Sequence, residues 1–123
     1  MYREITLQMN DGREKTFGFL ATGATSMRYR MVFGEDMIIG LLNLMNGGTS
    51  ADTTASDRLA FIMNAQAERK DMTKLSLESF IEWADQFDGG TLNDHMNDFV
   101  GMYFNQRKTT STAKKEAARQ TEK

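Results

Sequence analysis

Few residues in this sequence have side chains that could carry out chemistry. The chain has no cysteine and a single histidine, His95, which stands between Asp94 and Asp98. A carboxylate beside a histidine can form an acid–base pair or part of a metal site. Because no second histidine or thiolate is available to complete such a site, we interpret His95 as a surface residue on an acidic helix face.

Motifs for cofactor or nucleotide binding are also missing. Gly47-Gly48 is not followed by the Gly-Lys-Ser/Thr that completes a phosphate-binding loop. The acidic residues do not have the spacing of an EF-hand. We therefore expect a protein that is not an enzyme and that uses no cofactor and no metal.

The composition indicates one small domain without a membrane segment. The 123 residues are 40% apolar and 26% charged, which is ordinary for a globular protein. The most apolar segment, 37–45, is interrupted by Gly40 and Asn43, and it is shorter than the roughly 18 residues of a membrane span. With no cysteine and no apolar leader, an intracellular protein is the simplest expectation.

Charge is distributed unevenly along the chain. Residues 105–123 hold six basic and two acidic side chains, a net of +4; the totals of 15 and 17 leave 9 and 15, or −6, for residues 1–104. An acidic body argues against a dedicated nucleic-acid-binding domain. The segment 105–123 is polar and poor in apolar and aromatic side chains, so we predict a single domain over 1–104 and a disordered basic tail.

The N-terminal segment predicts an antiparallel hairpin. Apolar and polar residues alternate on both sides of Asp11-Gly12, and Asp-Gly between alternating runs is typical of a tight turn. We expect strands over residues 3–9 and 14–21. Because a lone hairpin is marginally stable, its apolar face must pack on helices.

Helix signals follow the hairpin. Thr25 or Ser26 can cap a short helix over 27–33 that ends at Gly34, and Asp36 can cap a second helix over 37–45. Arg28 and Arg30 flank Tyr29; they either pair with Glu35 or Asp36 or line an acidic partner surface.

Three more helices are predicted after a polar loop. The third covers 54–70, with Leu59, Ile62, Met63 and Gln66 on one face and with Arg58, Asn64 and Glu68 elsewhere. The fourth starts after Ser76 and stops at Asp88-Gly89-Gly90. Thr91 caps the fifth, Asp94 completes a capping box, and the apolar stripe runs over Leu92, Met96, Phe99, Val100 and Tyr103. The predicted fold class is α+β and mainly α-helical, an N-terminal β-hairpin followed by about five helices.

Apolar surfaces are the candidates for function. The helix over 37–45 is apolar around most of its circumference, which predicts burial on several sides or contact with a partner. The ten methionines could fill a core or form a surface that accepts varied partner helices. Trp83 and Tyr103 lie beside apolar stripes and are candidate association residues. The predicted partner-binding residues are Met37, Ile38, Leu41, Met45, Trp83 and Tyr103.

Two segments carry a resemblance to a known family. The first comprises Thr22, Arg28, Tyr29, Arg30, Phe33, Gly34, Asp36 and the run from Met37 to Leu44; the second is Phe80 to Phe87, FIEWADQF. This succession of a small-residue turn, a Tyr-Arg pair, a Phe-Gly corner, an acidic residue and an apolar helix resembles the tail assembly chaperones of long-tailed, siphovirus-type bacteriophages.

The resemblance implies a function without catalysis. Such a chaperone binds the tape measure protein and keeps it soluble in the host cytoplasm while the tail tube assembles, and it is not expected in the mature virion. The tail tube protein and a second copy of the chain are further candidate partners, whereas nucleic acid and membranes are not expected. Two other classes stay open: a virion structural subunit, such as a tail terminator or head–tail joining protein, and a small regulatory nucleic-acid binder, which the acidic body disfavours.

Overall fold

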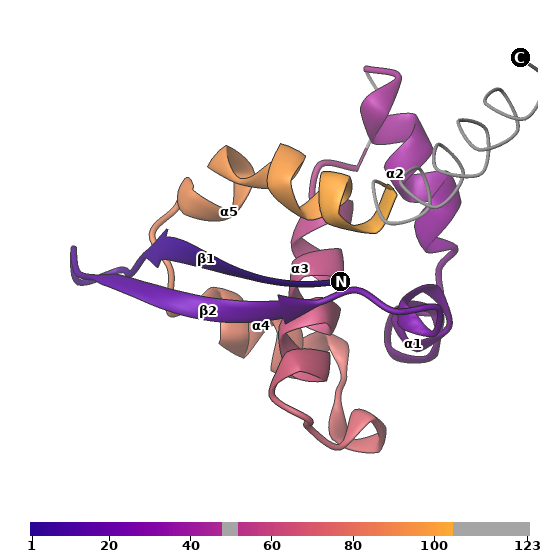
Figure 1. The fold of residues 1–123 in the computed structure, drawn as a ribbon, viewed down its shortest axis with the longest axis horizontal. Helices are drawn as coiled ribbons and strands as arrows, with labels where there is room; N and C mark the ends of the chain where they lie inside the picture. Colours follow the sequence, from indigo (N-terminus) through magenta and orange to yellow (C-terminus); the bar gives the residue numbers. More distant parts are fainter. Residues whose placement is uncertain (48–51, 105–123) are drawn as a thin grey trace, which may run out of the picture.

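The structure, a computed structural model, describes residues 1–47 and 52–104. The fold is α+β and mainly helical, as the sequence predicts, with an N-terminal hairpin followed by helices (Figure 1). The predicted disorder of 105–123 lies outside the described residues. The elements are β1 (Tyr2–Gln8), β2 (Glu14–Leu20), α1 (Thr25–Phe33), α2 (Met37–Met45), α3 (Ala55–Ala67), the 3₁₀ helix η1 (Met72–Lys74), α4 (Leu77–Ala84), α5 (Thr91–Asp94) and a further helical segment over 96–104.

The hairpin forms one layer of the molecule. β1 and β2 pair antiparallel in a register that runs from Tyr2 opposite Leu20 to Gln8 opposite Glu14, and Gly12 takes the positive φ of 87° that the turn needs. Both strands end within one residue of the prediction. Alternate side chains point to the core and are buried: Ile5, Leu7, Phe17 and Phe19.

The helix α3 is the centre of the core. The hairpin strand β2 and the helices α1, α2, α4 and α5 all pack against it, and Figure 1 shows it behind the hairpin with α4 and α5 on opposite sides. Eleven of its 13 residues are buried. The four residues predicted to share one face are buried, and Arg58 and Asn64, which were placed elsewhere, are buried as well, because neighbours cover most of the helix.

Buried polar side chains of α3 are tolerated because each finds partners. The Asn64 amide donates to the Gly18 carbonyl at 2.9 Å, and its oxygen accepts from the Trp83 indole N–H at 3.0 Å. The Gln66 amide donates to the Leu20 carbonyl at 2.6 Å and to the Thr25 hydroxyl at 2.9 Å. These bonds offset the cost of removing polar atoms from water, and they tie α3 to the hairpin.

Three predicted helix boundaries are confirmed. Gly34 ends α1 in the left-handed conformation with φ 69°. The Asp36 carboxylate accepts from the Ile39 backbone N–H at 3.1 Å and caps α2. Ser76 caps α4 and forms a reciprocal capping box with Ser79.

The predicted caps at Thr25 or Ser26 and at Thr91 are wrong. Thr25 is the first residue of α1, and its hydroxyl accepts from the Thr22 N–H at 2.9 Å. At α5 the Asp88 carboxylate accepts from the Thr91 N–H at 2.7 Å, while the Thr91 hydroxyl accepts from the Gln8 N–H at 3.0 Å. The Thr25 hydroxyl also accepts from the Gln66 amide of α3, and the Thr91 hydroxyl accepts from β1, so contacts outside the helix start take the place of the local capping bond. The fifth helix is also interrupted, by a turn at His95.

Candidate partner-binding surface

The helix α2 has two unlike faces. Met37 and Leu41 are buried, whereas Ile39, Leu42 and Met45 are 59%, 44% and 58% exposed. The buried side packs against α3 at close range, because a Cβ at Gly40 would lie 3.5 Å from that of Ala55. The helix is therefore half-buried, and its outer side is aliphatic.

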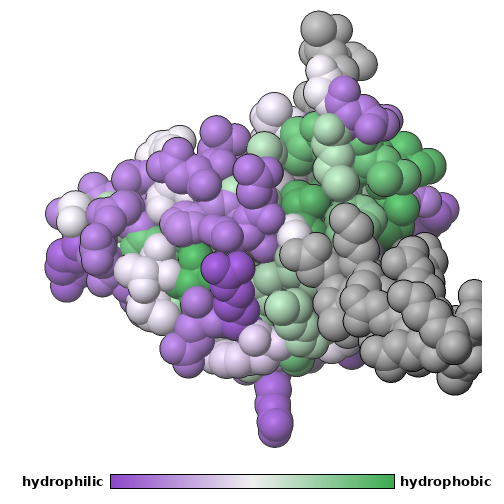
Figure 2. All heavy atoms as spheres, turned by 45° about the horizontal axis from the view of Figure 1, so that its top comes forward, coloured by the Kyte–Doolittle hydropathy of each residue, from purple (hydrophilic) through white to green (hydrophobic). Residues whose placement is uncertain are grey.

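The exposed side of α2 forms a continuous apolar surface. We call the partly buried Ile38 together with Ile39, Leu42 and Met45 the α2 face. Figure 2 shows hydrophobic side chains gathered over this helix, beside a largely hydrophilic remainder of the same view. From Met37 to Ala51 the sequence has no charged residue, so the α2 face offers a partner apolar contacts and no ion pairs.

The structure separates the predicted partner-binding residues into two groups. Ile38 and Met45 belong to the α2 face. Met37, Leu41, Trp83 and Tyr103 are buried in the core. For these four residues the prediction of a partner-accessible side chain is wrong.

Core contacts explain this burial. The indole N–H of Trp83 is bonded to Asn64, and its ring lies 4.8 Å from that of Phe87 in edge-to-face geometry. Ile39 and Leu42, which sequence reasoning missed, replace Met37 and Leu41 at the surface. Since all four are aliphatic, periodicity alone could not tell which side of α2 faces the core.

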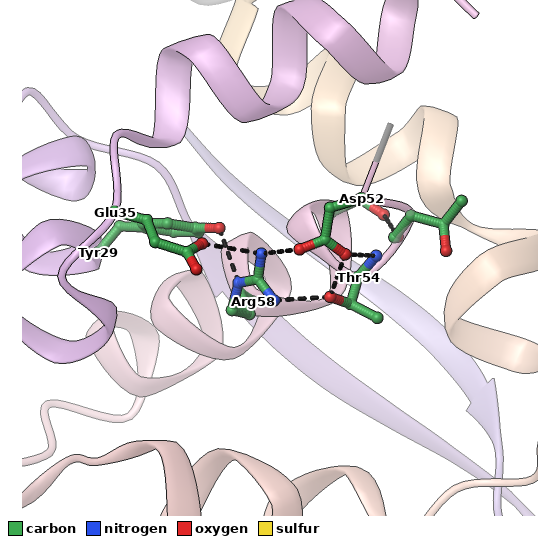
Figure 3. A network of polar contacts seen from close by, with 7 residues as sticks. Tyr29, Glu35, Asp52, Thr54 and Arg58 are labelled. Carbon is green, nitrogen blue, oxygen red and sulfur yellow. Dashed lines mark hydrogen bonds and ion pairs between the residues drawn. The ribbon is translucent and has the colours of Figure 1, made fainter. Parts of the chain in front are cut away.

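A polar network centred on Arg58 ties segments before and after α2 to α3 (Figure 3). The Arg58 guanidinium donates to the Tyr29 hydroxyl at 2.9 Å, to the Glu35 carboxylate at 3.0 Å, to the Asp52 carboxylate at 2.5 Å and to the Thr54 hydroxyl at 2.6 Å. Glu35 precedes α2 and Asp52 follows it along the chain. One buried side chain therefore holds the two segments that flank the α2 face.

This network was not predicted from the sequence. Glu35 pairs with Arg58 instead of Arg28 or Arg30, and the Arg28 guanidinium donates to the Gln66 amide oxygen at 2.8 Å. Arg58 was placed off the apolar face of its helix. Its guanidinium also lies 5.9 Å and 5.7 Å from the ring centroids of Tyr29 and Phe33, so ring faces and hydrogen bonds together accommodate the buried cation.

Two carboxylates near the start of α3 have opposite electrostatic surroundings. Hydrogen bonding to Arg58 lowers the pKa of Asp52 to about 2. Burial raises the pKa of Asp57 to about 6. One oxygen of Asp57 is buried without a hydrogen-bond partner among the described residues. Asp57 is thus the carboxylate that the fold leaves poorly solvated.

The histidine lies beside the carboxylate that links the C-terminal helical segment to β1. Its Nδ1 lies 2.8 Å from the Asp98 carboxylate, which also pairs with Arg3 of β1 at 3.4 Å. Across residues 1–47 and 52–104, no group of three or more His, Cys, Asp or Glu side chains is arranged to hold a metal ion. Within that same part of the chain, no helix has the length and apolar character needed to cross a membrane.

Comparisons of this chain with known protein families, with curated proteins and with solved structures find no match.

Proposed function

We propose that this chain is a tail assembly chaperone of a long-tailed bacteriophage. It binds a helical segment of the tape measure protein in the host cytoplasm, keeps that protein soluble during assembly of the tail tube, and is not retained in the virion. The observation that carries the proposal is the exposed, uncharged α2 face. The resemblance of the segment 17–45 to this family supports the same function.

The α2 face suits reversible binding to an apolar helix. Its side chains recur along about two turns, so a partner helix laid across it would cover them with an aliphatic stripe of its own. Each aliphatic side chain contributes at most about 1.5–3 kcal/mol on full burial, and much of this gain is offset by the entropy lost on association. Weak, exchangeable contacts of this kind fit a protein that must release its client.

Co-expression with the tape measure protein tests the proposal. We expect the partner to precipitate when expressed alone and to stay soluble with the wild-type chain. Leu42→Glu should abolish this effect, because it places a charge in the α2 face. Asn43→Glu is the matched control, since Asn43 is a polar, exposed neighbour on the same helix, and it should keep the partner soluble.

Two results would contradict the chaperone function. The first is a partner that is equally soluble without this chain. The second is stoichiometric presence of the chain in purified virions, which would favour a virion structural subunit such as a tail terminator or head–tail joining protein.

A further inference from the structure

The helix α4 presents a second exposed face with a different chemistry. Leu77 and Ile81 are 57% and 51% exposed and lie one turn apart. Glu78, Glu82 and Asp85 are exposed as well. At about 100° per residue, the three acidic side chains form a lane along the helix beside the two aliphatic ones. We call these five residues the α4 face.

The α4 face is held in a fixed orientation. Phe80 and Trp83 on the opposite side of the helix are buried in the aromatic core. The capping box of Ser76 and Ser79 fixes the first turn. A partner would therefore meet a preformed surface and would not have to order it.

The acidic lane is not neutralised within the described part of the chain. None of Glu78, Glu82 and Asp85 forms an ion pair there. The sequence from 75 to 104 has six carboxylates and neither Lys nor Arg; the carboxylates are Glu78, Glu82, Asp85, Asp88, Asp94 and Asp98. The nearest preceding cation in the sequence is Lys74, at the N-terminal end of the helix.

We infer that the α4 face is a docking site for a basic amphipathic helix of a partner protein. Aliphatic residues of that helix would cover Leu77 and Ile81, and its Lys or Arg side chains would lie opposite the acidic lane. The apolar contacts supply affinity, while the charges select the partner and speed its association. This inference goes beyond the proposed function and does not depend on the phage assignment.

The chemistry of the face disfavours the other occupants. Nucleic acid and anionic membranes would place negative charge against three carboxylates. A second copy bound symmetrically through the same face would bring two acidic lanes together. The chain's own segment 105–123 is basic but contains no large apolar side chain, so it would leave Leu77 and Ile81 exposed to water.

Binding of a defined peptide to the full chain tests the inference. The probe is a fluorescein-labelled amphipathic peptide of leucine and lysine, with the leucines on one helical stripe, followed by fluorescence anisotropy. We expect saturable binding that weakens severalfold between about 50 mM and about 300 mM NaCl, because exposed charges are screened by salt. Equal binding of a matching leucine–glutamate peptide would overturn the proposal.

Paired variants locate the contact. Leu77→Ala combined with Ile81→Ala should weaken binding by about tenfold or more, and Glu78→Gln combined with Glu82→Gln by about threefold to tenfold. All four side chains are at least partly exposed, so the melting temperature should stay at the wild-type value. Met27→Ala combined with Met31→Ala, at exposed positions of α1, is the control and should leave binding unchanged. An α2 variant, Ile39→Ala combined with Leu42→Ala, reports any binding of the peptide to the α2 face.

Two outcomes would overturn the assignment of the face. One is loss of peptide binding in the α2 variant together with unchanged binding in the α4 variants. The other is a tenfold gain of affinity in Lys114→Gln combined with Lys115→Gln, which would identify the chain's own basic segment as the occupant.

Discussion

In α2 and α3, the burial of side chains does not follow their polarity. The more apolar helix exposes one side to solvent, and the more polar helix is almost fully buried. The helix α2 contains no charged residue, yet Ile39, Leu42 and Met45 are exposed. Its neighbour α3 contains arginine, asparagine and glutamine, yet eleven of its 13 residues are buried. The difference shows that the position of a helix among its neighbours, and the partners available to its polar atoms, decide what is buried.

The partners of α3 come from the hairpin and from the segments around α2. In the two-stranded sheet, β2 pairs with β1 along one edge only, which leaves carbonyls such as those of Gly18 and Leu20 free to accept from α3 side chains. The helix α3 can therefore occupy the centre of the fold, because its side chains both fill space and form hydrogen bonds with the backbone carbonyls of β2.

The largest effect that tests this comparison concerns two adjacent leucines of α2. Leu41 is fully buried and Leu42 is partly exposed. We expect Leu41→Ala to lower the free energy of unfolding by about 3 kcal/mol, because it leaves a cavity in the core. The matched variant Leu42→Ala should change it by less than about 1 kcal/mol. Urea denaturation measures the free energy of unfolding of both variants. Equal losses would show that Leu41 and Leu42 are equally buried, which would contradict the orientation of α2 described above.

A smaller loss is expected when the network at the start of α3 is broken. Arg58→Met keeps much of the contact with the rings of Tyr29 and Phe33 but removes the guanidinium donor from the Tyr29 hydroxyl and from the Glu35 and Asp52 carboxylates. Asp52 still accepts from Thr54. Since both carboxylates are about half-exposed, water recovers part of the loss, and we expect a destabilisation of about 2 kcal/mol.

Arg30→Met is the control for this variant. Arg30 is exposed on α1 next to Tyr29, and its replacement should alter the free energy of unfolding by no more than about 0.5 kcal/mol. If the loss in Arg58→Met is as small as that in Arg30→Met, the hydrogen bonds of Arg58 contribute little to stability. Arg58 would then act through its bulk, which methionine retains.

The smallest effect is a pH dependence from Asp57. Because burial raises the pKa of this carboxyl to about 6 from an ordinary 3.8, the folded chain holds the proton more tightly than the unfolded chain does. Its contribution to stability is complete below pH 3.8 and is lost as the pH rises to about 6. The shift corresponds to at most about 3 kcal/mol. Because the position of Asp57 in the first turn of α3 favours the charged form and the side chain is only partly buried, we expect a loss of about 1 kcal/mol.

The variant Asp57→Asn isolates this contribution. Thermal unfolding between pH 4 and pH 7 should show a flatter pH dependence for the variant and a higher stability than the wild type at pH 7. Asp52 acts in a lower window, because its pKa is depressed to about 2 and its stabilisation is lost as the pH falls below 3.8. An unchanged slope above pH 4 in Asp57→Asn would contradict the assignment.

Local patterns in the sequence predict where the helices and strands of this fold begin and end better than they predict which residues pack around each element. The alternation around Asp11-Gly12 is sufficient to place the hairpin, and Gly34, Asp36 and Ser76 mark helix ends because their effects act within a few residues. The roles of Arg58 and Asn64 could not be predicted in the same way. Their partners lie 19 to 46 residues away for Asn64, and 4 to 29 residues away for Arg58.

The candidate surface was predicted only in part, for a related reason. The sequence identifies the helix over 37–45 as unusually apolar, but Met37 and Leu41 are about as apolar as Ile39 and Leu42. Which pair is buried depends on how α2 packs against its neighbours, where Gly40 allows a close approach to Ala55 of α3. Trp83 and Tyr103 were predicted as surface residues, but both are buried. The sequence does not show whether the polar atom of such a side chain finds a hydrogen-bond partner inside the core, as the Trp83 indole N–H does with Asn64.

The burial of Trp83 has a practical consequence for spectroscopy. The chain has one tryptophan, and its indole is enclosed by aromatic rings and bonded to Asn64 at the junction of α3 and α4. Its fluorescence should therefore be emitted at short wavelength in the folded protein and shift to the red when that junction opens to water. The single tryptophan reports on the centre of the fold, so opening of the core can be followed in real time without a label.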